Sequence, residues 1–417
     1  MSTRPFQKRQ AVQVYLVGGS VRDQLLGLPI KDRDWVVVGS SPSLMLEQGF
    51  ISVGKDFPVF LHPQTKEEYA LARTEKKSGS GYHGFECFFS PEVTLEEDLM
   101  RRDLTINAIA QDPQGQLIDP YHGQTDLAQR ILRHVSSAFA EDPVRILRVA
   151  RFAARFASLG FTIAPETMAL MRQMVQSGEV AHLTAERVWQ ELHQALATDH
   201  PDIFLSVLRE CGALAVIFPE IDCLFGVPQP PKWHPEIDTG EHTLMVLRQS
   251  TRLSTSLPVR FAAMVHDLGK GKTPPSEWPS HKMHTHTGLA CIRALCERIR
   301  VPAEYRDLAL IVCEQHSNVH NAAILKPATY LKILNKMDVW RKPERLESVL
   351  LCCQADHQGR LGYEEIPYPQ KLQFETAYQA ALAIDVQSII AEGLKGSEIR
   401  DELDKRRIAA IKAVLSR

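Results

Sequence analysis

A Gly-Gly pair followed by two spaced aspartates limits what this chain can fold into more than any other feature. Residues 12–17 are predicted to form a strand, and Gly18 and Gly19 permit a tight turn after it. Ser20 then begins a predicted helix, with Arg22 in its first turn. The unpaired N–H groups at the start of such a helix can meet phosphate oxygens, which makes the turn a candidate phosphate site.

Asp32 and Asp34 follow a break at residues 27–29 and lead into the apolar run 35–38. Side chains two residues apart project from the same face of a strand, so both carboxylates are expected on one side of it. Mg²⁺ is usually held by one or two carboxylates together with substrate phosphates. Alone, a Gly-Gly turn or a spaced aspartate pair is more often structural. Together they predict a site for a nucleoside triphosphate and its magnesium.

The segment 16–23, Leu-Val-Gly-Gly-Ser-Val-Arg-Asp, followed by Asp32-Arg33-Asp34, resembles the signature of class II nucleotidyltransferases. This class contains the bacterial CCA-adding enzymes and the poly(A) polymerases. The resemblance implies that Asp32 and Asp34 are catalytic and bind Mg²⁺. It also implies nucleotide binding by Gly19 and Arg22.

Arg101, Arg102 and Asp103 end a stretch with helical periodicity that begins at residue 95. Paired arginine and aspartate side chains can hold a triphosphate and ribose hydroxyls, and surface ion pairing is the alternative. The three residues resemble the R-R-D motif of the same class. The resemblance implies that Arg102 contacts phosphate and Asp103 contacts ribose.

Asp142 precedes a proline, as an N-cap followed by proline at the first helical position would, so capping alone could explain it. Arg145, Arg148 and Arg151 recur every three residues, and a solvated basic face is the alternative for them. The segment resembles the E-D-x-x-R-x-x-R motif of the class, which implies nucleotide binding by all four residues. Asp142 would accept from the exocyclic amine of cytosine or adenine, and Arg145 would donate to the adjacent ring nitrogen. Such a pair would reject UTP and GTP without a template.

Histidines and aspartates separated by helical stretches mark a second candidate site. Imidazole and carboxylate are metal ligands, and structural histidines are the alternative. The H…HD…H…H…D order resembles the HD-domain phosphohydrolases, which implies a divalent transition metal, Ni²⁺ being one candidate, and catalysis by His266 and Asp267. The implied metal ligands are His242, His266, Asp267, His284, His316 and Asp356. His286 and His320 lie close in sequence and leave the ligand set open.

The expected fold class is α+β, with a small nucleotidyltransferase head and a mostly helical remainder. The predicted domains are a head at 1–138, a helical neck with the nucleotide-recognition helix at 139–226, an HD domain at 227–356 and a helical tail at 357–417. A glycine-rich segment at 76–84 predicts a mobile loop, and the proline-rich run 227–235 predicts a linker.

Composition fits a large soluble enzyme. The 417 residues are 44% hydrophobic but contain no 18-residue apolar run, so no membrane partner is expected. The N-terminus has no apolar core typical of a signal peptide, and the eight cysteines form no C-x-x-C pair, which favours the cytoplasm. The net charge of −2 does not itself indicate a nucleic-acid partner, so any basic face must be local.

The whole chain therefore resembles the multifunctional bacterial CCA-adding enzymes. This resemblance implies CCA addition to tRNA from CTP and ATP, together with phosphatase and 2′,3′-cyclic phosphodiesterase activity in the HD domain. A homodimer is one arrangement left open. A poly(A) polymerase is the nearest rival. An enzyme that uridylylates a regulator protein and a non-catalytic RNA-binding module are two further alternatives.

Overall fold

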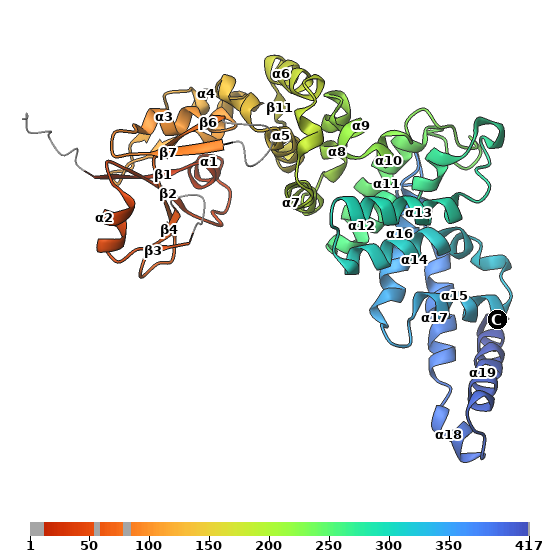
Figure 1. Cartoon of the computed structure of the whole chain (residues 1–417). Coiled ribbons are helices and arrows are strands. Elements are labelled where there is room, and N and C mark those ends of the chain that lie inside the picture. The colour runs from red at the N-terminus through yellow and green to blue at the C-terminus, as the bar shows by residue number, and fades with distance from the viewer. Residues whose placement is uncertain (1–11, 54–58, 78–84, 416–417) are drawn as a thin grey trace, which may run out of the picture. The chain divides into compact units, whose positions relative to one another are not determined.

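The computed structural model describes residues 12–53, 59–77 and 85–415. Two compact units divide the chain: one extends to Val188 and includes Glu210–Ala213, and the other comprises Trp189–Arg209 and Leu214–Arg417. The strands of the described residues all belong to the N-terminal part, and helices make up the remainder (Figure 1). The expected α+β class is thus confirmed.

The first unit contains a mixed seven-stranded sheet, whose strands lie in the order β3-β4-β5-β2-β1-β8-β9. At its centre β2 pairs antiparallel with β1 and parallel with β5. The strands of this sheet are β1 (Gln13–Val17), β2 (Asp34–Val38), β3 (Ile51–Ser52), β4 (Val59–Leu61), β5 (Glu68–Leu71), β8 (Ala110–Gln111) and β9 (Leu117–Ile118). Two smaller sheets pair β6 (Arg73–Lys77) with β7 (Phe85–Phe89), and β10 (Ile131–Leu132) with β11 (Thr162–Ile163).

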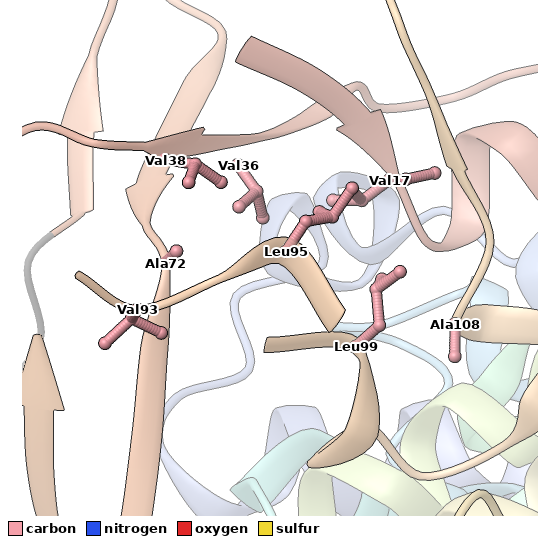
Figure 2. Close-up of a cluster of buried hydrophobic side chains, with 9 residues drawn as sticks. Val17, Val36, Val38, Ala72, Val93, Leu95, Leu99 and Ala108 are labelled. Carbon is pink, nitrogen blue, oxygen red and sulfur yellow. The ribbon is translucent and has the colours of Figure 1, made fainter. Parts of the chain in front are cut away.

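Alternation along β2 divides the core of the head between the two faces of the sheet. Val36 and Val38 pack with Val17 and with Leu95 and Leu99 of α3 (Leu95–Met100), as Figure 2 shows. Val37 points the other way and joins a cluster with Met45, Phe60 and Leu71. Because successive strand residues face opposite sides, four consecutive apolar residues bury both faces at once. This burial fixes the strand that begins at Asp34.

The remaining helices of the first unit carry the other motifs. They are α1 (Gly19–Leu25), α2 (Pro42–Glu47), α4 (Gly123–Gln129), α5 (Val144–Arg155) and α6 (Pro165–Gln176). The predicted strand, turn and helix at residues 12–25 are therefore confirmed. The expectation that both aspartates belong to a strand is wrong, because β2 begins at Asp34 and Asp32 lies in the extended segment before it. Of the predicted loop at 76–84, residues 78–84 lie outside the described part of the chain.

Helices continue to the C-terminus. They are α7 (Ala185–Leu196), α8 (Pro201–Glu210), α9 (Ala213–Ile217), α10 (Pro219–Asp222), α11 (Thr239–Leu253), α12 (Leu257–Val265), α13 (His284–Arg298), α14 (Ala303–His320), α15 (Pro327–Met337), α16 (Glu344–Gln358), α17 (Pro369–Leu382), α18 (Val386–Ala391) and α19 (Ser397–Leu415). In the second unit α12 packs against α11, α14 and α16, and α17 packs against α19. No helix among the described residues is both long and apolar enough to cross a membrane.

The proline-rich run 227–235 interrupts the helices as expected, but it is packed rather than a free linker. Pro228 forms a bridge with Asp238, and Gln229 is only 1% exposed. Gln229 accepts a hydrogen bond from Lys270, which lies in the short 3-10 helix that follows α12. The run therefore belongs to the wall of the helical unit.

Candidate nucleotide site and candidate metal centre

The turn between β1 and α1 requires glycine at its first position. Gly18 has φ 71°, and a Cβ placed there would lie 3.0 Å from Nη1 of Arg102. A side chain would be strained at this φ and would also displace the arginine. Gly18 therefore brings Arg102 against the turn, and Gly19 begins α1 directly beyond it.

Asp32 and Asp34 line one cavity of about 670 Å³, together with residues 65–68 from the approach to β5. The pKa of Asp34 is raised above its ordinary value. Burial is the largest cause, and the negative charge of Asp32 acts in the same direction, whereas the positive charge of Arg102 opposes the shift. Two neighbouring carboxylates in one cavity suit a shared cation. Glu68 was missed by the sequence reasoning. It pairs with Asp34 across β2 and β5 and lines the same cavity.

Arg22 lies in the interior of the first unit rather than at this cavity. Its side chain is 3% exposed, its Nε donates to Asp23 at 2.8 Å, and its Nη1 donates to Asn107 at 2.5 Å. The guanidinium also lies over the rings of Phe152 and Phe156 of α5, and burial lowers its pKa. In this arrangement Arg22 joins α1 to α5.

The Arg-Arg-Asp motif, just after α3, has two half-buried arginines and a buried aspartate. Arg101 and Arg102 both pair with Asp98, at 3.1 and 3.2 Å. Asp103 is buried; its Oδ1 accepts from Leu104 N and from Asn107, and its Oδ2 accepts from Arg148 at 2.7 Å. Both oxygens of Asp103 are therefore engaged inside the protein, so its ribose role stays a prediction.

Asp142 faces Arg187, a residue that the sequence reasoning missed. Nη1 and Nη2 of Arg187 donate to Oδ1 and Oδ2 of Asp142 at 3.0 and 2.6 Å, and both side chains remain about one-fifth exposed. Oδ1 also accepts from Val144 N, so Asp142 acts as a cap as well, although α5 begins one residue later than expected. Arg145 donates instead to two carbonyls, of Ala138 and Arg101.

The arginines of α5 do not form a solvated basic face. Arg145 and Arg151 are buried, at 7% and 9% exposed, whereas the Arg148 side chain is 37% exposed. Arg151 lies over the ring of Phe152, at 4.5 Å from its centroid. The three-residue spacing of these arginines therefore allows α5 to pack against the head, as well as allowing contact with a ligand.

The predicted histidines and aspartates of the second unit converge into one buried cluster. His242, His266 and Asp356 form one group of three candidate ligands, and Asp267, His284 and His316 form a second. Nε2 of His242 lies 2.9 Å from Asp356 Oδ1, and Nε2 of both His284 and His316 lies 3.5 Å from Asp267 Oδ1. All six predicted ligands therefore lie together.

The chemistry of this cluster fits a metal cation. Nε2 of His266 and Oδ1 of Asp267 are buried without a hydrogen bond among the described residues. Burial opposes the charged form of His266, but the negative charges of Asp267 and Asp356 outweigh burial and raise its pKa to about 10. The two carboxylates therefore favour a positive charge at this position, which a metal cation could supply in place of the proton. Burial lowers the pKa of His284 to about 4 and keeps that imidazole neutral, as a ligand must be.

The histidines that the sequence left open as ligands differ in position. His284, at the first position of α13, approaches Asp267, and His286 belongs to none of the candidate ligand groups among the described residues. Nε2 of His320 donates to Asp356 Oδ2 at 2.6 Å, and Nδ1 of His320 lies 2.9 Å from the hydroxyl of Tyr368. His320 therefore adjoins the cluster through Asp356.

Glu236 and His234 were also missed. Glu236 Oε1 lies 2.9 Å from His242 Nδ1 and 3.0 Å from His234 Nδ1. Because Nδ1 of His242 faces this carboxylate, Nε2, on the side of Asp356, is the nitrogen that would be available to a metal ion. In the sequence, Glu236 is one glutamate directly after the proline-rich run and belongs to no motif.

Comparison with known proteins agrees with this arrangement. The Poly A polymerase head domain model matches residues 14–133, the model for a probable RNA and SrmB-binding site of polymerase A matches 160–224, and the HD domain model matches 239–357. Fold and sites thus define a nucleotidyltransferase head joined to an HD domain.

The relatives are more specific. The multifunctional CCA protein of Vibrio cholerae is 70% identical over 403 residues, covering 97% of this chain and 100% of the relative. That of Vibrio parahaemolyticus is 70% identical over 406 residues, with the same coverage. This chain belongs to the multifunctional CCA protein family.

Solved structures share the fold at low sequence identity. The CCA-adding enzyme of Bacillus stearothermophilus in complex with CTP has a TM-score of 0.64 and 21% identity, covering 97% of this chain and 89% of that one. The Thermotoga maritima CCA-adding enzyme complexed with tRNA has a TM-score of 0.63 and 20% identity, covering 97% and 91%.

Proposed function

We propose that this chain adds cytidine, cytidine and adenosine to the 3′ end of tRNA from CTP and ATP, and that its HD domain hydrolyses phosphate esters. The observation that carries the proposal is 70% identity to multifunctional CCA proteins across the full length of those relatives. We also propose that the chain divides into a head, a neck, an HD domain and a tail at residues 138, 226 and 356.

In the head, Asp32 and Asp34 would hold Mg²⁺, which when bound activates the attacking hydroxyl and stabilises the leaving pyrophosphate. The 3′-oxygen of tRNA forms a bond to the α-phosphorus while the bond to pyrophosphate breaks, and the hydroxyl loses its proton. Support comes from the cavity that both carboxylates line. Arg102, held beside the Gly18 turn, is proposed to contact the triphosphate, next to Gly19.

Base selection is assigned to Asp142 and Arg145, with Arg187 added. Arg187 holds the Asp142 carboxylate bidentately. Since Oδ1 also accepts from Val144 N, Oδ2 is proposed to accept from the amine of cytosine or adenine with its second lone pair. Arg145 reaches a base only by exchanging a carbonyl partner for it. Arg22, Asp103, Arg148 and Arg151 are proposed to act on the nucleotide through the packing of α5 on the head.

In the HD domain, His242, His266, Asp267, His284, His316 and Asp356 would hold one or more divalent transition metal ions, with Ni²⁺ proposed. The metal, when bound, lowers the pKa of a water ligand. A water oxygen would bond to phosphorus as the ester P–O bond breaks, and the proton that the water loses would go to the alcohol oxygen set free. This serves phosphomonoesters and 2′,3′-cyclic phosphodiesters alike. His266 and Asp267 are the proposed catalytic pair.

One assay tests the proposed nucleotide addition. The protein is incubated with tRNA lacking its 3′ end and with each labelled nucleotide separately, then with CTP and ATP together. Two cytidines followed by one adenosine are expected. Extended adenosine tails would indicate poly(A) synthesis, and labelling of a protein instead of RNA would indicate a regulator-modifying enzyme.

The cytoplasm is the proposed location, since no disulfide joins the cysteines of the described residues. A homodimer is the proposed assembly, which sedimentation of the full chain would distinguish from a monomer.

A further inference from the structure

A cavity of about 440 Å³ opens beside the HD metal ligands and is lined by more than those ligands. His284, His316 and Asp356 form part of its wall. Among the described lining residues, the cationic side chains are Lys270 and Arg360. A substrate phosphate at this centre would lie near both Lys270 and Arg360. The contacts that each side chain already makes within the protein determine which of them is available to bind the phosphate.

Lys270 is already committed. Its Nζ lies 2.6 Å from Asp267 Oδ2 and donates to Gln229 Oε1 at 2.6 Å. The charge of Lys270 is therefore largely neutralised by the carboxylate it holds in place.

Arg360 is not committed in this way. Its side chain is 12% exposed, and its Nη2 lies 3.9 Å from Asp356 Oδ1, which is beyond hydrogen-bond distance. Its Nε is buried without a hydrogen-bond partner among the described residues. A buried guanidinium with unused donors is costly unless something accepts from it. Its fork of N–H groups matches phosphate oxygens.

The backbone on each side of Arg360 is tied to the metal centre. The Gly359 carbonyl lies 3.1 Å from His242 Nδ1, and Leu361 N donates to Glu236 Oε2 at 3.4 Å. A Cβ at Gly359 would lie 2.6 Å from the Cα of Val246, so only glycine permits this approach to α11. Arg360 is thereby fixed relative to His242, the ligand on α11.

Other unused polar atoms line the same wall. Nε2 of His357 and Oε1 of Gln370 are buried without hydrogen bonds in the described part of the chain. Arg360 and Gln370 both lie beyond residue 357, where the match to the HD domain model ends. This part of the cavity lining thus comes from the end of α16, the segment that joins α16 to α17, and the start of α17.

We propose that Arg360 binds the phosphoryl group of the substrate at the HD metal centre, so that the segment after the HD domain proper supplies substrate recognition. The proposal rests on the phosphohydrolase function proposed above. The ligand class is a phosphate ester whose non-bridging oxygens can accept from both the metal ions and the Arg360 guanidinium.

The test uses the metal-loaded full chain, titrated calorimetrically with inorganic phosphate. Arg360→Gln should weaken phosphate binding about tenfold to hundredfold, as expected for losing a charged hydrogen-bonding group. Arg360→Lys should lose less, because it keeps the charge without the fork. Arg252→Gln, a change at an exposed arginine of α11 that faces Glu365 at 3.5 Å, is the matched control and should bind phosphate as the wild type does. KM for a phosphomonoester should rise in the same order.

Metal content, measured by mass spectrometry, separates binding from structure. Arg360→Gln with full metal content and unchanged phosphate affinity would overturn the assignment. The assignment would also be overturned if the phosphate affinities of Arg360→Gln and Arg360→Lys fell only in proportion to the metal that these variants lose. A wild-type protein that binds phosphate through Arg360 yet hydrolyses no ester would contradict the phosphohydrolase function instead.

Discussion

Asp142 makes two kinds of contact: it caps the start of α5, and it pairs with the guanidinium of Arg187. It accepts from Val144 N at the start of α5 and from both guanidinium nitrogens of Arg187. The first contact stabilises a helix end, and the second orients a carboxylate that is still one-fifth exposed. A capping residue that is also held by an external arginine is set up to present its oxygens to a ligand.

Asp142→Ala should therefore reduce discrimination of CTP and ATP against UTP and GTP. A lost base contact of this kind is worth about 1–3 kcal/mol, roughly tenfold to hundredfold in selectivity. Loss of the cap alone would cost about 1 kcal/mol of stability with the nucleotide ranking unchanged. Measuring kcat/KM for all four nucleotides beside a thermal melt decides between these outcomes. A lower melting temperature with the parental ranking would leave Asp142 as a cap only.

Glu236 acts on the metal centre through His242 Nδ1, at 2.9 Å. Glu236→Gln should reduce metal affinity of the HD domain about tenfold to hundredfold, because the imidazole loses the carboxylate that fixes its orientation. Equilibrium dialysis with Ni²⁺ measures this directly. Glu365→Gln, at a 91% exposed side chain, is the control. Unaltered metal affinity in Glu236→Gln would show that Gly359 alone orients His242.

At the scale of elements, Asp98 holds the C-terminal end of α3 against β6. Its carboxylate is 1% exposed, pairs with Arg101 and Arg102, and accepts from Arg73 N. Burial opposes its ionised form, but the two arginines and the backbone bond outweigh burial and lower its pKa. Since Arg102 is also the residue held beside the Gly18 turn, Asp98 supports the candidate nucleotide site from behind.

Asp98→Asn should destabilise the head by about 3–5 kcal/mol near pH 7, because two partly buried arginines lose their partner. A depressed pKa means that Asp98 stabilises the folded state above its ordinary value of 3.8 and that this stabilisation is lost as pH falls through the folded value. The difference in melting temperature between wild type and Asp98→Asn should therefore shrink below about pH 4. Scanning calorimetry at several pH values checks this, with exposed Glu47→Gln as control. A difference that stays constant with pH would contradict the assignment.

Elements with strong local signals were predictable, and those set by distant contacts were not. The strand, turn and helix at residues 12–25 follow from an apolar run, two glycines and the start of a periodic pattern. The start of β2 at Asp34 was misplaced because pairing with Val17 and Glu68, not local sequence, decides where the strand begins. Likewise, Arg187 and Glu236 reach their partners through tertiary packing, and neither stood in a motif.

At the scale of the whole molecule, each candidate site is built from one compact unit. Asp32 and Asp34 belong to the first unit, and His242 through Asp356 belong to the second. The order of the two sites along the chain could be predicted from the sequence, because each motif contains residue types suited to a different reaction. It could not predict that the run 227–235, read as a linker, packs into the second unit through Gln229 and Lys270.

Because the sites share no residue, their activities should be lost independently. Asp34→Ala should abolish nucleotide addition to tRNA and leave ester hydrolysis largely intact, since it removes a carboxylate only from the first cavity. His266→Ala combined with Asp267→Ala should abolish divalent-metal-dependent hydrolysis and spare CCA addition, since the group with His242 and Asp356 and the group with His284 and His316 each lose a member. Each variant is assayed for both reactions, with circular dichroism to confirm that it is folded. A folded variant of either kind that loses both activities would mean that the two sites depend on each other, and hydrolysis that persists without His266 and Asp267 would move that activity away from the HD centre.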